Sequence, residues 1–188
     1  MELYAVAGME IVSRLGSFGK DVFLDLKLYD IAETVKRATR QICKSGGATF
    51  LTVHGSRAIM RAAVEGRGDS KTKLLGVTVL TNFDQEDMAD LGFPMPVSDL
   101  VELRVKKAVE SGMDGVVCSP LEVVRVRKAG GPKLLIVTPG VRSRGAAKAD
   151  QKRVATPREA IRNGADYLVI GRQVTRASNP EAAVSYTH

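Results

Sequence analysis

Short apolar runs rich in Val, Leu and Ile alternate with amphipathic stretches along the chain. A run of this kind, bounded by polar residues or glycine, is typical of a strand buried on both faces. Six such runs are predicted to be strands, at 22–28, 50–53, 74–80, 115–118, 134–138 and 167–170. Segments with helical spacing lie at 31–43, 56–64, 100–109, 121–126 and 156–163. This alternation predicts a parallel sheet with helical crossovers.

The order of these elements favours an α/β fold of the TIM (β/α)8 barrel type that lacks about its first two strands. A complete barrel has eight βα units, whereas six are recognisable here, and the sequence opens on a predicted helix at 2–15 with no strand before it. A chain of 188 residues is expected to form a single, partial barrel domain over 1–188. An open doubly wound sheet has the same periodicity and is the alternative.

Composition narrows the range of partners. The net charge of +7 favours a nucleic acid, a membrane surface or a small anionic ligand. Nucleic acid is disfavoured because the basic residues are dispersed and no aromatic residues stand among them as stacking platforms. Cys43 and Cys118 are distant and have no neighbouring His, so neither a zinc site nor a disulfide framework is predicted. Without a signal peptide or an apolar membrane span, a soluble cytoplasmic protein is expected.

A pattern of alternating charges stands at the end of the first predicted strand. Because side chains alternate along a strand, Asp25 and Lys27 share one face, opposite the leucines between and beside them. In a parallel barrel this face points inward at the carboxyl ends of the strands, where barrel enzymes keep their active sites. Placing charges there costs desolvation free energy, so each charge is expected to have an opposite charge nearby or a role in function. Asp25, Lys27 and the following Asp30 are therefore candidate catalytic residues.

Two carboxylates near Lys27 should keep its amine protonated and make it a proton donor. Thr34 follows Asp30 by one helical turn and lies on the same helix face. The simpler alternative is an ordinary ion pair at a strand end, followed by an aspartate at a helix N-terminus.

A second group of candidates follows the last two predicted strands. Arg142 comes after the run at 134–138, and Gly171 and Arg172 come after the run at 167–170. Backbone N–H groups and guanidinium groups at such positions can converge on a phosphate, and the loops after the last two strands are the recurrent phosphate site of this fold. Weaker candidates are Thr81 and His54, each of which directly follows another predicted strand.

Taken together, these segments resemble a known family. Residues 23–31, with Thr34 and Val35, resemble the signature of orotidine 5'-phosphate decarboxylases. Segments 137–142, 150–153, 156–157 and 170–172 resemble the phosphate-loop region of that family, in the same order and with similar spacing. The resemblance implies decarboxylation of orotidine 5'-monophosphate to uridine 5'-monophosphate, without a cofactor or metal, by a homodimeric barrel.

The resemblance also implies a role for each matched residue. Lys27 would protonate C6 of the pyrimidine, and Asp25 would lie beside the departing carboxylate. Asp30 and Thr34 would reach the ribose of the substrate in the neighbouring subunit. The remaining residues expected to bind the substrate are Ile31 within the signature, Thr81 at the pyrimidine, and Arg142, Gln151, Gly171 and Arg172 at the phosphate.

The sequence departs from the family pattern at its front. The family has an aspartate on its first strand and a lysine at the end of its second, and neither has a counterpart here; Ala32 stands where the family commonly has proline. We therefore expect the 188-residue chain to have low activity and to expose unpaired strand edges that are prone to association. The alternatives are a catalytically impaired barrel that binds phosphate ligands and a magnesium-dependent sugar-phosphate decarboxylase or aldolase of the same superfamily. Segment 150–153 and Thr34 disfavour the magnesium enzyme.

Overall fold

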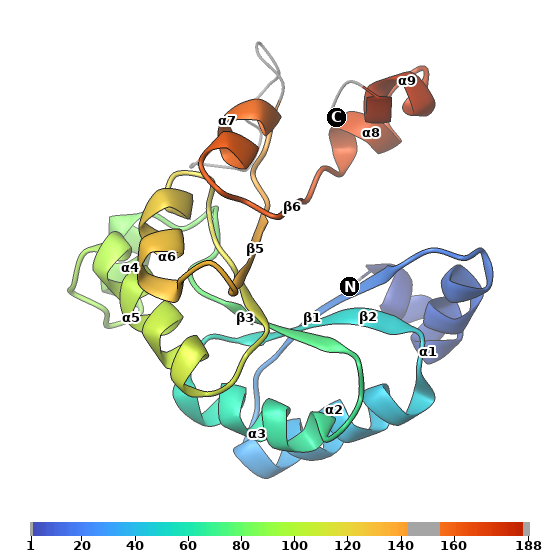
Figure 1. Cartoon of the computed structure of the whole chain (residues 1–188), viewed down its shortest axis with the longest axis horizontal. Coiled ribbons are helices and arrows are strands. Elements are labelled where there is room, and N and C mark those ends of the chain that lie inside the picture. The colour runs from blue at the N-terminus through green and yellow to red at the C-terminus, as the bar shows by residue number, and fades with distance from the viewer. Residues whose placement is uncertain (1, 143–154, 186–188) are drawn as a thin grey trace. The chain divides into compact units, whose positions relative to one another are not determined.

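The structure is a computed structural model and describes residues 2–142 and 155–185. Its strands are β1 (Val22–Leu28), β2 (Ala48–His54), β3 (Lys73–Val77), β4 (Gly115–Val117), β5 (Leu135–Thr138) and β6 (Tyr167–Leu168). Its helices are α1 (Glu2–Ser17), α2 (Ala32–Ser45), α3 (Arg57–Arg67), α4 (Gln85–Asp90), α5 (Val97–Glu110), α6 (Val123–Gly130), α7 (Pro157–Arg162), α8 (Arg172–Thr175) and α9 (Pro180–Ser185). Helices and strands alternate as predicted (Figure 1).

The strand order decides between the two predicted architectures. The strands follow one another in chain order, β1-β2-β3-β4-β5-β6. A doubly wound sheet instead reverses its order at a switch point, so the chain order fits the barrel type of α/β fold. Among the helices of 2–142 and 155–185, none combines the length and the apolar character that crossing a membrane requires.

Two predicted strands end at least two residues earlier in the structure than in the sequence pattern. The run at 74–80 gives a strand that ends at Val77, and the chain then enters a turn. Val79 lies in this turn and is almost completely buried. A buried turn carries the same apolar residues as a strand, so the pattern alone placed the boundary wrongly. Similarly, the run at 167–170 gives only Tyr167–Leu168, although the N–H of Val169 still donates to Thr138.

The chain divides into two compact units, and each is described by itself. The first comprises residues 1–77 and 106–115. Its strands β1, β2 and β3 pair in parallel, and α2 and α3 lie side by side along them (Figure 1). The two helices approach closely at Gly66, where a Cβ atom would clash with the carbonyl oxygen of Lys36. This contact requires glycine. The prediction of a single domain over 1–188 stays a prediction.

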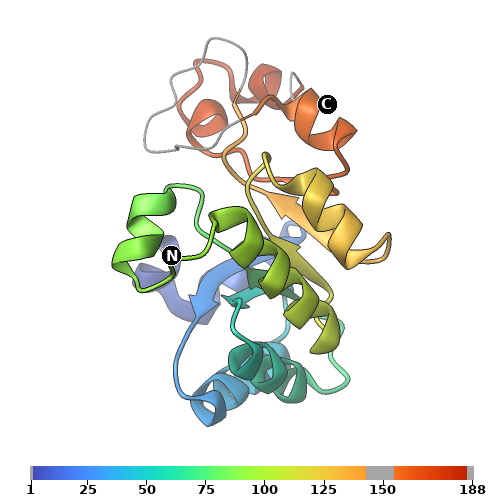
Figure 2. The ribbon, with the colours of Figure 1, turned by 90° about the vertical axis from the view of Figure 1, so that its left-hand side faces the viewer.

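The second unit comprises residues 78–105 and 116–188. Strands β5 and β6 pair in parallel, and α6 packs beside β5 (Figure 2). Arg125 of α6 joins this helix to α5, because its guanidinium contacts Asp99 and Glu102, each at 2.7 Å. Helix α7 begins at a capping box formed by Thr156 and Glu159, which satisfies backbone N–H groups that the first helical turn leaves without partners.

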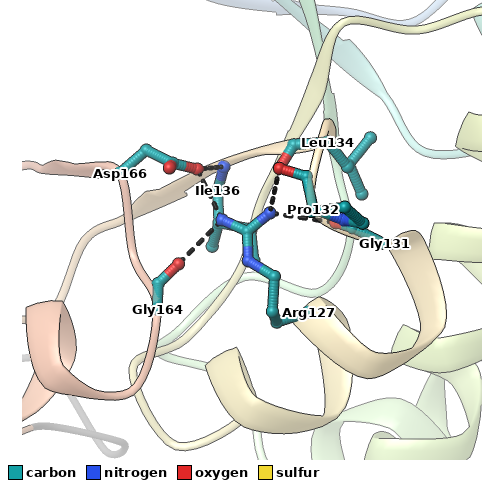
Figure 3. Close-up of polar contacts among 7 residues, drawn as sticks. All are labelled: Arg127, Gly131, Pro132, Leu134, Ile136, Gly164 and Asp166. Carbon is teal, nitrogen blue, oxygen red and sulfur yellow. Dashed lines mark hydrogen bonds and ion pairs between the residues drawn. The ribbon is translucent and has the colours of Figure 1, made fainter.

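Arg127 of α6 holds together several backbone segments of the second unit (Figure 3). Its guanidinium donates to the carbonyl oxygens of Leu134 at 2.6 Å and Gly164 at 2.8 Å. It also contacts the carboxylate of Asp166 at 2.7 Å, and the same carboxylate oxygen accepts the N–H of Ile136 at 2.7 Å. One arginine therefore ties the beginnings of β5 and β6 to the end of α6.

The first unit contains the same arrangement. Arg67, the last residue of α3, pairs with Asp114, whose carboxylate accepts the N–H of Leu74 at 2.8 Å. In both units the aspartate comes two residues after a glycine with positive φ: Gly112 at 76° and Gly164 at 107°. The repeated Gly-x-Asp before a strand is visible in the sequence, but sequence reasoning did not assign it. Because these groups stand at the amino ends of the strands, the arrangement is structural.

Candidate active site

Asp25 and Lys27 form a direct ion pair at the end of β1. The amine nitrogen of Lys27 lies 2.7 Å from Oδ2 of Asp25, and the side chains of Lys27 and Asp25 are 36% and 42% exposed. The predicted placement of the two residues on one face of the strand is confirmed. Partial exposure leaves both charged groups accessible to a ligand, so the pair can exchange a proton with a bound molecule.

The backbone at this pair departs from regular strand geometry. Lys27 has φ of 53°, the one positive φ among the described non-glycine residues. The register of β1 against β2 shifts at the same place: Leu24 pairs with Leu51, whereas Leu28 pairs with Val53. Four steps along β1 thus match two along β2, which is a bulge. Strained backbone of this kind clusters at functional sites.

The neighbouring strand supports this bulge through Thr52, which sequence reasoning missed. The hydroxyl of Thr52 accepts the N–H of Lys27 at 2.9 Å and donates to Oδ1 of Asp25 at 2.7 Å. A threonine inside an apolar strand has the composition expected for β structure alone. The available signal was its spacing: Thr52 stands two residues before His54, on the same face of β2.

The leucines of β1 line a different surface. Leu26 and Leu28 border a groove of about 730 Å³, to which α1 contributes Met9 and α2 contributes Ile42. This groove lacks the charged pair and lies on the opposite face of β1, as alternation predicts. It is therefore separate from the candidate site. Helix α1 itself is interrupted at Gly8, where φ is 54° and ψ is −145°.

Asp30, Ile31 and Thr34 lie in the exposed connection from β1 into α2. The carboxylate of Asp30 accepts the N–H of Ile31 at 2.6 Å, and Thr34 is exposed in the first turn of α2. Ile31 is 77% exposed and Tyr29 is 69% exposed. The ring of Tyr29 stacks on that of His54, with centroids 4.1 Å apart. This stacking gives His54 a packing role.

The first turn of α2 also carries a charged pair. A hydrogen bond from Arg37, with further attraction from Arg37, Lys36 and Arg40, lowers the pKa of Glu33 below its ordinary value. The carboxylate of Glu33 therefore stays ionised through the neutral range, and it neutralises part of the basic surface of α2.

The remaining candidates belong to the second unit. Thr81 is buried in the turn after β3. Arg142 follows β5, and its guanidinium donates to the carbonyl oxygen of Val141 at 2.7 Å. Gly171 and Arg172 are exposed at the start of α8, just after β6. Gln151 lies outside the described residues.

The second unit also contains a buried polar group that sequence reasoning did not single out, the hydroxyl of Thr138. The hydroxyl of Thr138 is buried at the end of β5, and it has no hydrogen-bond partner within the described part of the chain. In 2–142 and 155–185 no group of three or more His, Cys, Asp or Glu side chains is arranged to hold a metal ion.

Comparison with known proteins adds the family. The model of the orotidine 5'-phosphate decarboxylase / HUMPS family matches residues 1–186. An orotidine 5'-phosphate decarboxylase of Nitrobacter winogradskyi is 55% identical over 181 residues, which are 96% of this chain and 75% of the relative. One of Rhodopseudomonas palustris is 51% identical and covers 97% of this chain and 77% of the relative. The chain thus spans about three quarters of the length of these relatives.

Solved structures agree with the sequence comparison. Orotidine 5'-phosphate decarboxylase from Lactobacillus acidophilus is similar with a TM-score of 0.81 and 35% identity, over 96% of this chain and 79% of that one. An uncharacterized conserved protein from Geobacillus kaustophilus gives the same TM-score and identity, over 98% of this chain and 82% of that one. With the family model matched along nearly its whole length, the chain belongs to the orotidine 5'-phosphate decarboxylase / HUMPS family.

Proposed function

We propose that this chain is an orotidine 5'-phosphate decarboxylase, which converts orotidine 5'-monophosphate to uridine 5'-monophosphate and CO2. The observation that carries the proposal is the contact of 2.7 Å between Lys27 and Asp25. It forms in a member of this family whose relatives at 51% and 55% identity bear this name. Pyrimidine synthesis is the route to which this reaction belongs.

The ion pair suits the chemistry of the reaction. Loss of CO2 leaves an electron pair on C6 of the pyrimidine, and the Lys27 ammonium supplies the proton that neutralises it. Asp25 holds this amine by its carboxylate and would lie beside the departing carboxylate of the substrate. An ammonium fixed before the reaction stabilises the developing charge more than the ground state, and this difference accelerates the reaction.

The phosphate would be held by Arg142, Gln151, Gly171 and Arg172, with Thr81 at the pyrimidine. Guanidinium groups bind phosphate in a bidentate geometry, and the positions after β5 and β6 are those used for phosphate in barrels. Binding energy from a phosphate remote from C6 can be used to stabilise the transition state. These residues are proposed as the phosphate site because of their positions in the chain and their resemblance to the phosphate-loop region of the family.

A homodimer is proposed as the working assembly, with Asp30 and Thr34 shared across subunits. Support comes from the exposed apolar side chains of Tyr29 and Ile31, which flank Asp30. Exposed apolar side chains beside a functional carboxylate favour a protein contact. In such a dimer the carboxylate of Asp30 would reach the ribose in the partner's site, while Ile31 would contact the substrate.

The proposed reaction uses no cofactor or metal, because the ammonium of Lys27 performs the one proton transfer required. We place it in the cytoplasm, since Cys43 is a free thiol and thiols persist in reducing compartments.

The experiment that tests this function is turnover of orotidine 5'-monophosphate by the chain, with and without a chelator. We expect release of CO2 and uridine 5'-monophosphate that is slow, because of the departures at the front of the sequence, and that is unaffected by the chelator. The family model also covers the HUMPS group, so a sugar phosphate should be assayed in parallel with magnesium. Turnover of the sugar phosphate alone would favour the magnesium enzyme. Binding of uridine 5'-monophosphate without any turnover would favour the impaired, phosphate-binding barrel.

A further inference from the structure

We propose that Thr52 is a positioning residue, which holds the strained bulge of β1 and thereby sets the place of the Lys27 amine. This inference deepens the proposed decarboxylase function and rests on it. Its basis is a closed set of hydrogen bonds within the first unit, and the residues involved are Asp25, Lys27 and Thr52.

The hydroxyl of Thr52 both accepts and donates a hydrogen bond at this site. It accepts the backbone N–H of Lys27 at 2.9 Å and donates to Oδ1 of Asp25 at 2.7 Å. The second carboxylate oxygen of Asp25 contacts the Lys27 amine at 2.7 Å. The backbone and side chain of Lys27 are thus both fixed, directly or through Asp25, by one hydroxyl.

The bulge explains why a side chain is required at this point. In a regular parallel pair, the N–H groups of β1 that face β2 donate to backbone carbonyl oxygens of β2. The register shift between Leu24 and Leu28 removes Lys27 from the ladder, and its φ of 53° is unfavourable for a residue with a Cβ atom. Such a conformation persists only where its surroundings enforce it. Thr52 provides the acceptor that the ladder no longer supplies.

The location of Thr52 makes this support rigid. Its side chain is fully buried, and it lies in the middle of β2 between two paired strands. Buried polar groups fixed by the strands of a sheet hold a reacting group more accurately than groups on loops. Removing the hydroxyl would leave the N–H of Lys27 and one oxygen of Asp25 without this partner.

The chain contains a matched control at the other end of the same strands. The hydroxyl of Thr49 accepts the N–H of Val22 at 3.2 Å and donates to Asp21 at 2.9 Å. The pattern of bonds is the same as at Thr52, but it stands at the amino end of β1, away from Lys27. A structural role shared by both threonines would give the same result in both variants.

The first measurement follows the Lys27 amide and needs no turnover. We would compare native-state hydrogen exchange in the wild type and in Thr52→Val, Thr52→Ser and Thr49→Val. Exchange of the Lys27 N–H should accelerate about tenfold or more in Thr52→Val, because an exposed or unpaired amide exchanges faster. It should keep its wild-type rate in Thr52→Ser and Thr49→Val. Unchanged exchange in Thr52→Val would overturn the proposal.

The second measurement separates binding from chemistry. In Thr52→Val, kcat should fall by about 10- to 100-fold, since a small displacement of a catalytic group has effects of this size. KM should stay within about twofold, because the phosphate is held elsewhere. Thr52→Ser should recover most of kcat, and Thr49→Val should retain it. An equal loss in both valine variants would refute positioning by Thr52.

The two measurements distinguish a failure of the proposed function from a failure of the role proposed for Thr52. A wild-type chain without turnover would contradict the proposed function, while exchange at Lys27 would still decide whether Thr52 holds the bulge. If Thr52→Val does not fold, Thr52→Ala and Thr52→Ser differ by the same hydroxyl and give the same comparison.

Discussion

At the scale of single residues, catalysis and stability depend on different charged side chains. The amine of Lys27 is partly exposed and pairs with one carboxylate, which leaves it able to act on a ligand. Arg127 instead directs its guanidinium at the carbonyl oxygens of Leu134 and Gly164 and at Asp166 (Figure 3). Because the guanidinium of Arg127 is engaged with backbone carbonyl oxygens and with Asp166, this side chain stabilises the fold.

Arg127→Met should therefore destabilise the second unit. It removes the guanidinium that donates to several carbonyl oxygens and to the Asp166 carboxylate, and unsatisfied polar groups at partly buried positions cost about 1–3 kcal/mol. The matched variant is Arg125→Met on the same helix, whose more exposed pairs with Asp99 and Glu102 are screened by solvent and should contribute less to stability. Urea unfolding measures both. Equal losses of stability would contradict the role assigned to Arg127.

The residues of the candidate site differ in how far sequence could find them. Asp25 and Lys27 were predictable because charges at alternating positions stand out in an apolar strand. Thr52 was not, since threonine is common in strands for reasons of propensity alone. The φ of Lys27 was equally hidden, because nothing in the sequence marks a bulge that contains no glycine. Gln151 lies outside the described residues, and its role stays a prediction.

At the scale of elements, α2 and α3 of the first unit pack closely against each other. The contact at Gly66 has no room for a Cβ atom, since the nearest atom is the backbone oxygen of Lys36. A backbone atom cannot rotate away, so the two helices must separate to admit a larger residue.

Gly66→Ala should therefore destabilise the first unit by about 1–3 kcal/mol, the usual effect of overpacking. Gly16→Ala on α1 is the control, because a Cβ atom added there would have no atom within 4 Å, and alanine is the better helix former. Denaturant unfolding of both variants gives the comparison. A neutral Gly66→Ala would show that α2 and α3 can move apart without loss.

The alternation of apolar runs identified each of the six strands that residues 2–142 and 155–185 form, because a strand buried on both faces has few polar residues. The ends of these strands were harder to predict from the sequence. The turn after Val77 is as apolar as the strand before it. The short helices α4, α8 and α9 lack the length at which helical periodicity becomes visible, whereas α7, which is as short as α4, has a recognisable start at Thr156 and Pro157. Chain order of the strands required the structure, since both candidate architectures share the same periodicity.

At the scale of the whole molecule, the proposed homodimer would bring residues of two subunits into one site. A dimer that shares Asp30 predicts complementation between two inactive variants. Lys27→Ala and Asp30→Ala should each lose most turnover alone, but a mixture should regain activity, because mixed dimers contain one site with both residues intact. Steady-state assays of the mixture, with sedimentation to follow dimer exchange, test this. No gain despite proven exchange would argue that Asp30 serves its own subunit.

In the proposed mechanism the Lys27 amine supplies the proton in decarboxylation. The most direct test of this step is turnover of orotidine 5'-monophosphate by Lys27→Ala beside Lys20→Ala, which removes an exposed lysine from the turn before β1. Lys27→Ala should fold and lose activity by a factor of about 100 or more, as expected for a general acid, whereas Lys20→Ala should match the wild type. Wild-type turnover in a folded Lys27→Ala protein would contradict the mechanism.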